Sequence, residues 1–151
     1  MTTQARGQHN RMRVILPAIS VNEAVARSAV AAFCAQCDPT VTELADIKCA
    51  VSEAVTNCIV HAYREREGEI CITAKVIEGG VRIAVRDRGC GLENVQRARE
   101  PLFTTDAAGE RSGMGFTVME SFTDRLAVYS AKGRGTLVVM TKYIGNCQKQ
   151  S

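Results

Sequence analysis

Glu53 and Asn57 stand four residues apart in a segment whose apolar residues recur with helical spacing. At 100° per residue they lie roughly 40° apart on one helix face, and Asp46 falls between them, opposite the apolar stripe. An amide oxygen and a carboxylate one turn apart suit a Mg²⁺ ion with an adjacent general base. A solvated polar helix face is the plain alternative, although Asn is a poor helix former at mid-helix.

A second candidate is the sequence Asp-Arg-Gly-Cys-Gly at residues 87–91, which directly follows an alternating apolar segment. Gly89 and Gly91 would let the backbone approach a flat ligand, and the carboxylate of Asp87 would accept a hydrogen bond from it. The same residue types also favour an ordinary turn, so this motif alone leaves both interpretations open.

Glycine-rich sequence at residues 109–116 leads into a segment with helical periodicity. Free N–H groups at a helix N-terminus bind phosphate, and Arg111 adds a bidentate donor for a terminal phosphate. The segment has neither the Gly-Lys-Ser/Thr of a Walker A motif nor the preceding strand of a Rossmann fingerprint. A flexible loop is the alternative, and Gly135-Thr136, the fourth candidate, reads by itself as a turn before a strand.

These candidate residues need a scaffold, and the periodicity of the apolar residues predicts five strands and three helices. In chain order we expect strand 12–19, helices 21–37 and 40–63, strands 70–77 and 81–87, a long loop or lid 88–115, helix 116–122, and strands 126–130 and 136–143. This order predicts an α+β, two-layer α/β sandwich with helices on one face of a mixed, mostly antiparallel sheet. We expect one domain over residues 12–144 between flexible tails, 1–11 and 145–151.

The two long helices begin at sequences of the capping-box form, Ser20 to Glu23 and Thr40 to Glu43. In the second helix the predicted buried stripe contains Leu44, Ile47, Val51, Ala54, Val55, Cys58 and Ile59. In the first helix the spacing indicates one face of mainly small residues, namely Ala24, Val25, Ser28, Ala29, Ala32 and Phe33.

Composition sets the remaining limits. The 151 residues carry 19 Lys and Arg against 16 Asp and Glu, and a net charge of +3 is too small to indicate direct nucleic-acid binding. No apolar run is long enough for a membrane span, and residues 1–13 lack the apolar core of a signal peptide, so we expect a cytoplasmic protein. The seven cysteines are odd in number and irregular in spacing, which favours free thiols over a disulfide or zinc framework.

Taken in order, the four candidates resemble the GHKL superfamily of ATP-binding domains, shared by gyrases, heat-shock 90 chaperones, mismatch-repair ATPases and histidine kinases. Three segments narrow the resemblance to the anti-sigma F factors of spore-forming bacteria. They are residues 52–63 (Ser-Glu-Ala-Val-Thr-Asn to His-Ala-Tyr), residues 101–105 (Pro-Leu-Phe-Thr-Thr) and residues 111–120 (Arg-Ser-Gly-Met-Gly-Phe-Thr-Val-Met-Glu). The resemblance covers roughly residues 12–144, and the segment from Pro101 to Glu120 is its most specific part.

The resemblance implies a protein serine/threonine kinase that uses ATP, releases ADP and requires Mg²⁺. Glu53 would act as base toward a serine hydroxyl, Asn57 would coordinate Mg²⁺, and Asp87 would recognise the adenine amino group. The other implied nucleotide-binding residues are Gly89, Gly91, Thr104, Thr105, Arg111, Ser112, Gly113, Met114, Gly115, Phe116 and Thr136.

The resemblance also implies partners. The protein would be a homodimer that binds and inhibits the sporulation sigma factor F and phosphorylates a serine of an anti-anti-sigma factor. Arg27, with Glu23, would contact these partners, although a solvated helix charge is the ordinary interpretation of Arg27. Four alternatives stay open: a two-component histidine kinase core, a general-stress-type anti-sigma factor, an ATP-dependent binding module without significant kinase activity, and an autonomous ATPase.

Overall fold

The computed structural model describes residues 10–64, 66–99 and 115–149, which form a sheet covered by helices. Five strands make one sheet in the order β1-β2-β3-β5-β4, and every pairing within it is antiparallel. The strands span Arg11–Pro17 (β1), Glu69–Ile77 (β2), Gly80–Asp87 (β3), Arg125–Ala131 (β4) and Gly135–Tyr143 (β5). The α+β prediction is therefore confirmed, and the sheet is fully antiparallel where a mixed one was expected.

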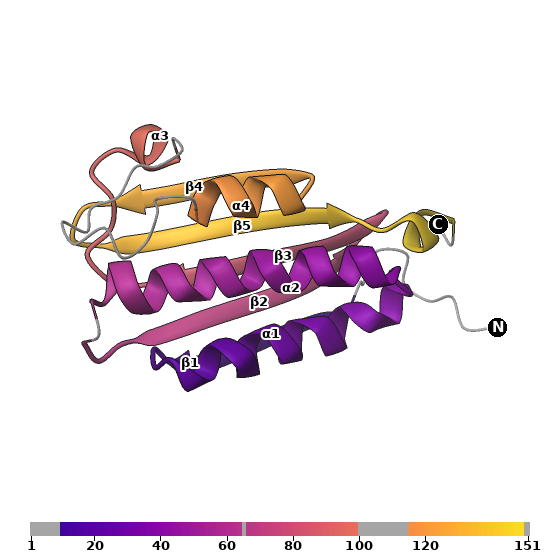
Figure 1. Cartoon of the computed structure of the whole chain (residues 1–151), viewed down its shortest axis with the longest axis horizontal. Coiled ribbons are helices and arrows are strands. Elements are labelled where there is room, and N and C mark those ends of the chain that lie inside the picture. Colours follow the sequence, from indigo (N-terminus) through magenta and orange to yellow (C-terminus); the bar gives the residue numbers. More distant parts are fainter. Residues whose placement is uncertain (1–9, 65, 100–114, 150–151) are drawn as a thin grey trace.

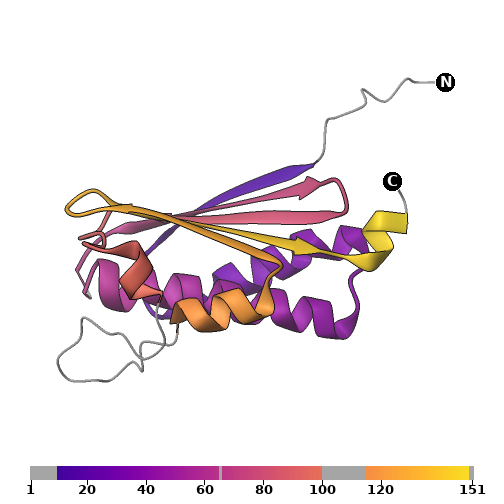
Figure 2. The same ribbon diagram turned by 90° about the horizontal axis from the view of Figure 1, so that it is seen from above.

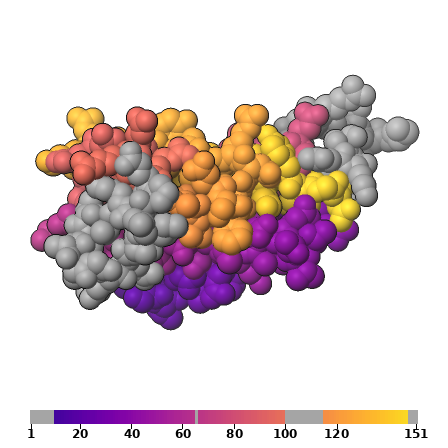
Figure 3. Space-filling model, turned by 45° about the horizontal axis from the view of Figure 1, so that its top comes forward, coloured from indigo at the N-terminus to yellow at the C-terminus, as the bar shows by residue number. Residues whose placement is uncertain are grey.

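The helices lie on one face of this sheet (Figures 1 and 2). The long helices are α1 (Val21–Cys34) and α2 (Val41–Thr56), and α4 (Gly115–Phe122) lies beside α2. On the surface α1 (indigo), α2 (purple) and α4 (orange) form one continuous helical side (Figure 3). The short helices are η1 (Ala35–Cys37), η2 (Asn57–Ala62), α3 (Val95–Ala98) and α5 (Gly145–Lys149). The opposite face of the sheet has no helical cover among the described residues.

One hydrophobic core lies between the two layers. The inward residues of β2 and β3 alternate with outward polar ones and are fully buried, as Ile72 and Ile83 illustrate. Helix α2 contributes the predicted stripe, in which Ile47, Val51 and Val55 are buried. Both patterns follow from the side-chain periods of strand and helix, so the sequence predicted this part of the core correctly.

The inward face of α1 differs from the predicted one. Ala26, Val30 and Cys34 are buried, whereas Ala24 and Ala32 of the predicted face are exposed. Small residues of α1 lie on all of its faces, so side-chain size alone does not show which face is buried. The buried set instead follows the i, i+4, i+8 spacing of one stripe that packs toward the core.

Of the two predicted capping boxes, only the second forms. Thr40 Oγ1 accepts the backbone N–H of Glu43 at 3.0 Å, and the carboxylate of Glu43 accepts the N–H of Thr40 at 2.8 Å. Ser20 has helical backbone angles and its side chain makes no capping hydrogen bond, so the prediction there was wrong. An N-cap residue needs non-helical backbone to aim its oxygen at the first free N–H groups.

Residues 145–149 form helix α5, where the sequence predicted a flexible tail. The carboxylate of Glu43 accepts the N–H of Gly145 at 3.2 Å, and the amide of Asn146 donates to the carbonyl of Asp38 at 2.7 Å. Cys147 packs against the core close to Cys37, and burial together with this neighbouring thiol raises the pKa of Cys37 to about 11. These contacts come from distant parts of the chain. A five-residue polar segment is too short to show a helical period, so the sequence could not predict this helix.

Every cysteine in the described residues is a free thiol. These include Cys34 and Cys37 of the C-x-x-C sequence, both of which are buried.

None of the helices described is both long and apolar enough to cross a bilayer.

Replacing Thr40 by Ala should lower the free energy of unfolding by about 1 kcal/mol, because α2 loses its N-terminal cap. Ser20→Ala is the matched control and should change it by less than about 0.5 kcal/mol, since Ser20 makes no cap. Urea unfolding followed by circular dichroism measures both variants. Equal losses in the two would contradict the assignment of a single working cap.

Candidate functional site

Asp87 ends β3 with its side chain turned inward, and it is only 5% exposed. Its Oδ1 accepts the backbone N–H of Gly89 at 2.9 Å and that of Thr136 at 3.2 Å. Its Oδ2 accepts the thiol of Cys58, a weak donor, at 3.6 Å. Burial is the main cause that raises the pKa of Asp87, and the three hydrogen bonds oppose it. The site therefore contains a costly buried carboxylate with one weakly engaged oxygen.

Residues 88–91 form a tight loop against the end of η2. A Cβ atom at Gly89 would lie 2.4 Å from the carbonyl oxygen of Ala62, and one at Gly91 would lie 2.1 Å from the carbonyl oxygen of Ala131. Gly91 also has a φ of 70°, which side chains rarely adopt. Close approach to the protein's own backbone therefore requires glycine at these two positions, whereas the sequence predicted that they make room for a ligand, which stays a prediction.

Two hydroxyl groups complete this end of the site. Ser130 of β4 and Thr136 of β5 are cross-strand partners, and their side-chain oxygens lie 2.8 Å apart. Ser130 Oγ also accepts the N–H of Leu92 at 2.8 Å, which ties the loop after β3 to the sheet. The sequence analysis selected Thr136 but missed Ser130 and Cys58, because a single Ser in a strand or Cys in a helix carries no distinctive pattern.

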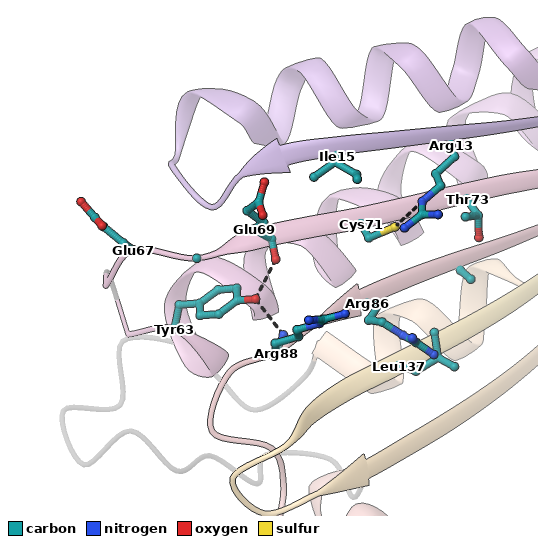
Figure 4. Close-up of a pocket in the computed structure, with 12 residues that line it drawn as sticks. Arg13, Ile15, Tyr63, Glu67, Glu69, Cys71, Thr73, Arg86, Arg88 and Leu137 are labelled. Atoms are coloured by element: carbon teal, nitrogen blue, oxygen red, sulfur yellow. Dashed lines mark hydrogen bonds between the residues drawn. The ribbon is translucent and has the colours of Figure 1, made fainter.

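Tyr63, which directly follows η2, supports the same loop through two hydrogen bonds. Its phenol donates to the carbonyl of Glu69 at 2.6 Å and accepts the N–H of Arg88 at 2.7 Å (Figure 4). Burial is the main cause that raises the pKa of this phenol. The neutral phenol, which can both donate and accept, is the form that this bridge requires.

Glu53 and Asn57 lie at the end of α2, where the helix changes character. Residues 57–62 are a π-helix, whereas the sequence predicted a single α-helix to residue 63. π turns are rare and frequently lie at functional sites, and a 3.6-residue period cannot predict them. Both side chains are partly buried, and neither has a hydrogen-bond partner among the residues that the structure describes.

Gly115 begins α4 directly against Asn57. A Cβ atom at Gly115 would lie 3.0 Å from Oδ1 and 3.1 Å from Nδ2 of Asn57. The structure thus brings together two residues that are 58 positions apart in the sequence and that were both predicted to serve the same ligand. Phe116 follows on α4 and packs against the core.

Asp46, which shares the predicted polar face of α2, has a separate structural role. It accepts a hydrogen bond from Lys142 of β5 at 3.0 Å, and the same ammonium donates to the carbonyl of Phe122 at 3.2 Å. Both charged side chains of this ion pair are largely buried. The polar face of α2 is therefore divided between a structural ion pair at Asp46 and a site without described partners at Glu53 and Asn57.

Several predicted residues lie outside the described part of the chain, namely Thr104, Thr105, Arg111, Ser112, Gly113 and Met114. The described residues on either side of that segment are joined by an ion pair, in which Arg99 donates to Glu120 of α4 at 3.3 Å. This pair links the end of α3 to the helix that carries Gly115.

Two hollows lie on the surface near these residues. A shallow one of about 390 Å³ contains Asp87, Ser130 and Thr136. A larger groove of about 760 Å³ lies on the uncovered face of the sheet and contains Arg13, Ile15, Glu69 and Arg86, but none of the predicted nucleotide-binding residues (Figure 4). We place the candidate site by its polar groups and glycine contacts, because size alone would favour a groove that lacks them.

Arg27 and Glu23, the predicted partner-binding residues, lie together on α1. The Nε–H of Arg27 donates to Oε1 of Glu23 at 3.1 Å, one helical turn away. The side chain of Arg27 is 41% exposed, so the pair lies at the surface. Ile19, Val21 and Val25 near it are exposed large apolar residues.

Comparison with known proteins identifies the family. Residues 16–142 match the histidine kinase-like ATPase domain. The "Anti-sigma F factor" of Caldanaerobacter subterraneus subsp. tengcongensis is 56% identical over 137 residues, which cover 91% of this chain and 96% of that protein. The chain belongs to the anti-sigma F factor family. Proteins of the same name from Clostridium perfringens (54% over 134 residues, 88% of this chain and 96% of that one) and Bacillus thuringiensis (49% over 138 residues, 91% and 94%) agree.

A solved structure of the RsbU and RsbW domains of a Mycobacterium tuberculosis protein shares the fold of this anti-sigma F family member, with a TM-score of 0.66. The two sequences are 21% identical, and the match covers 89% of this chain and 32% of that one. This chain thus spans about a third of that structure, and the likeness supports the two-layer fold alone.

A histidine kinase-like ATPase domain implies ATP or ADP as ligand, and the described residues fit one. At one end, the weakly engaged oxygen of Asp87 offers an acceptor for an adenine amino group beside close-packed glycine backbone. At the other end, Asn57 and the N-terminus of α4 offer an amide oxygen and N–H donors suited to phosphates and a cation.

Asp87→Asn should flatten the pH dependence of stability. The folded protein holds the proton of Asp87 more tightly than the unfolded chain does. The stabilisation from this group is therefore complete below its ordinary pKa of 3.8 and is lost as pH rises through the raised value. Urea unfolding at several pH values above 3.8 should show the wild type losing stability relative to Asp87→Asn. Glu78→Gln, an exposed control, should track the wild type, and parallel curves for all three proteins would contradict the role of burial.

Proposed function

We propose that this protein is an ATP-dependent protein serine kinase that also binds and inhibits sigma factor F, with the anti-anti-sigma factor as its phosphorylation substrate. The observation that carries the proposal is the buried carboxylate of Asp87, set among close-packed glycines in a chain of the anti-sigma F factor family. We propose the specificity for serine, the requirement for Mg²⁺ and the two protein partners together with this activity.

The nucleotide would lie with its base at the end of β3 and its phosphates toward α4. Asp87 accepts from the adenine amino group, Gly89 and Gly91 keep the backbone clear of side chains, and Thr136 lies beside the carboxylate. ATP supplies the phosphoryl group, and Mg²⁺ neutralises charge on its phosphates. Asn57 would hold that cation through its amide oxygen.

Glu53 would accept the proton of the incoming serine hydroxyl. It lies one helical turn before Asn57, and no described residue occupies its carboxylate. In phosphoryl transfer the protein mainly positions the reactants and stabilises charge, so a base and a cation ligand on one helix place acceptor and phosphate side by side. The predicted phosphate-binding residues Thr104, Thr105, Arg111, Ser112, Gly113 and Met114, with Gly115 and Phe116, would complete the phosphate end.

The partners would dock on the outer surface of α1. Arg27 can offer its terminal guanidinium nitrogens to a carboxylate, because only its Nε–H is engaged by Glu23. Exposed apolar residues flank this pair, including Val25 on the same helix. An apolar surface with a central charged group is typical of a protein-binding face.

Two copies would pair through the uncovered face of the sheet. Ile15 is 50% exposed at the large groove, where Glu67 and Glu69 lie at one end, with Arg88 near them, and Arg13 lies at the other (Figure 4). A two-fold axis through such a groove brings Glu67 and Glu69 of one copy toward Arg13 of the other. The surface would thus offer opposite charges to a second copy around an apolar centre.

Glu53→Gln should retain ATP affinity and lower the rate of serine phosphorylation by about 10²–10⁴-fold, the usual contribution of a general base. The assay combines the protein, γ-labelled ATP, Mg²⁺ and a purified anti-anti-sigma factor, and measures label on serine. Glu78→Gln is the matched control and should retain the wild-type rate. Sigma binding and ATP binding without any label would favour the binding-module alternative, and label on histidine would favour a histidine kinase.

Ile15→Glu should convert a dimer to a monomer in sedimentation velocity, because it buries a charge at the centre of the proposed interface. Val41→Glu is the control, since Val41 is 89% exposed at the start of α2, where an acidic residue suits the helix. A wild-type monomer at every concentration, or a dimer that survives Ile15→Glu with its fold intact, would overturn this interface.

A further inference from the structure

The carboxylate of Glu23 pairs with Arg27 on α1 and also links α1 to α2. The same Oε1 that accepts the Nε–H of Arg27 at 3.1 Å also accepts the hydroxyl of Ser52 on α2 at 2.5 Å. The two donors come from different helices and meet at one oxygen. The result is a short chain of hydrogen bonds from Arg27 at the surface of α1 to the partly buried Ser52 of α2.

This arrangement departs from the ordinary behaviour of Ser52 and Glu23. A serine within a helix usually turns to solvent or bonds the carbonyl four residues back, whereas Ser52 donates across to another helix. The sequence predicts Glu23 in a capping box with Ser20, yet its carboxylate is engaged with Arg27 and Ser52 and no side-chain cap forms. Hydrogen bonds to a charged acceptor are the stronger class, so the bond from Ser52 is a strong polar link between the two helices.

The helices need such a link because their apolar contact is not directional. Helices α1 and α2 pack directly on each other, and Ala26 and Val30 of α1 lie in the common core. Small apolar side chains permit close approach, but the hydrophobic effect has no preferred direction. A hydrogen bond has a preferred distance and angle and therefore fixes the register.

Ser52 directly precedes Glu53 in the sequence and lies on the last turns of α2 before the π-helix. Arg27 belongs to the proposed docking surface, and Glu53 is the proposed base. The chain Arg27–Glu23–Ser52 thus connects the place where a protein substrate would be held with the helix turn where its serine would react.

We propose that Ser52 and Glu23 are positioning residues that hold the docking surface of α1 in register with the base on α2. The inference rests on the proposed function and deepens it. A substrate held at Arg27 presents its serine to Glu53 only if the two helices keep a fixed offset. Neither Ser52 nor Glu23 belongs to the proposed nucleotide site, so nucleotide affinity should be independent of the link.

The test compares Ser52→Ala, Ser52→Thr and Ser121→Ala in the full-length protein. Ser121 is an exposed serine of α4 whose hydroxyl donates to the carbonyl of Val118 in the same helix, so it serves as the matched control away from α1. Alanine favours a helix more than serine does, so Ser52→Ala should fold. Three quantities are measured for each variant: ATP affinity, sigma-factor affinity, and kcat/KM for phosphorylation of the anti-anti-sigma factor.

Ser52→Ala should lower sigma-factor affinity and kcat/KM by about fivefold each, as expected for losing one hydrogen bond to a partly exposed charged group. ATP affinity should stay within about twofold of wild type. Ser52→Thr keeps the hydroxyl and should restore most of the loss, and Ser121→Ala should match the wild type.

A double-mutant cycle separates positioning from general destabilisation. Arg27→Ala should cost less in the Ser52→Ala background than in the wild type, because the guanidinium has already lost its fixed orientation. Additive effects, or a Ser52→Ala protein with wild-type partner affinity and kcat/KM, would overturn the positioning role while leaving the proposed function intact. A wild-type protein that binds no sigma factor and phosphorylates no partner would instead overturn both.

Discussion

The buried carboxylate of Asp87 is the constraint on which the organisation of the site depends. A carboxylate removed from water must be hydrogen-bonded, and here its partners come from the loop after β3, from β5 and from the π-helix η2. Satisfying this one group therefore fixes three segments relative to each other. The glycines follow from the same requirement, because the loop can reach the carboxylate only by lying against the backbone of Ala62 and Ala131. Burial raises the pKa of Asp87, so the carboxylate is kept at a cost in stability.

The sequence predicted those features that repeat with a regular period. The strands, the stripe of α2 and the one-sided helical layer follow from alternation of two and of 3.6 residues, and they were correct within a residue or two. Three features with no period were missed. The capping box at Ser20 fails because Ser20 has helical backbone angles, and Glu23 is engaged by Ser52, a residue 29 positions away. Helix α5 depends on Glu43 and Asp38, and the π-helix inserts a residue into an otherwise regular helix. The hydrogen bonds of Glu23 and of α5 are long-range contacts, which the local pattern of a single sequence does not reveal.

The candidate site divides in the same way. Asp87, Gly89 and Gly91 were candidates because Asp and Gly after a strand form a recognisable motif, whereas Thr136 was selected through the family resemblance, and the structure brings these residues together. A shared role for Asn57 and Gly115 was also implied only by family resemblance, since nothing local connects a helix residue to a glycine 58 residues later. Ser130, Cys58 and Tyr63 support the site through single hydrogen bonds, and such residues look ordinary in sequence. A sequence can thus predict a site where glycines and Asp form a recognisable turn motif. The residues that support the site through single hydrogen bonds can be identified only in the folded structure.

The one-sided architecture explains how a small domain can serve a nucleotide, protein partners and a second copy without competition for space. The interior between sheet and helices contains the core, so functional groups can gather only at the end of the sheet or on an outer surface. The end of β3 carries the proposed nucleotide site, the outer surface of α1 carries the proposed docking face, and the uncovered face of the sheet carries the proposed dimer surface. Surfaces that are separate in this way need a rigid connection if they are to act together. Helix α2 can supply it, because its last turns carry Glu53 and Asn57 while Ser52 holds Glu23 of α1.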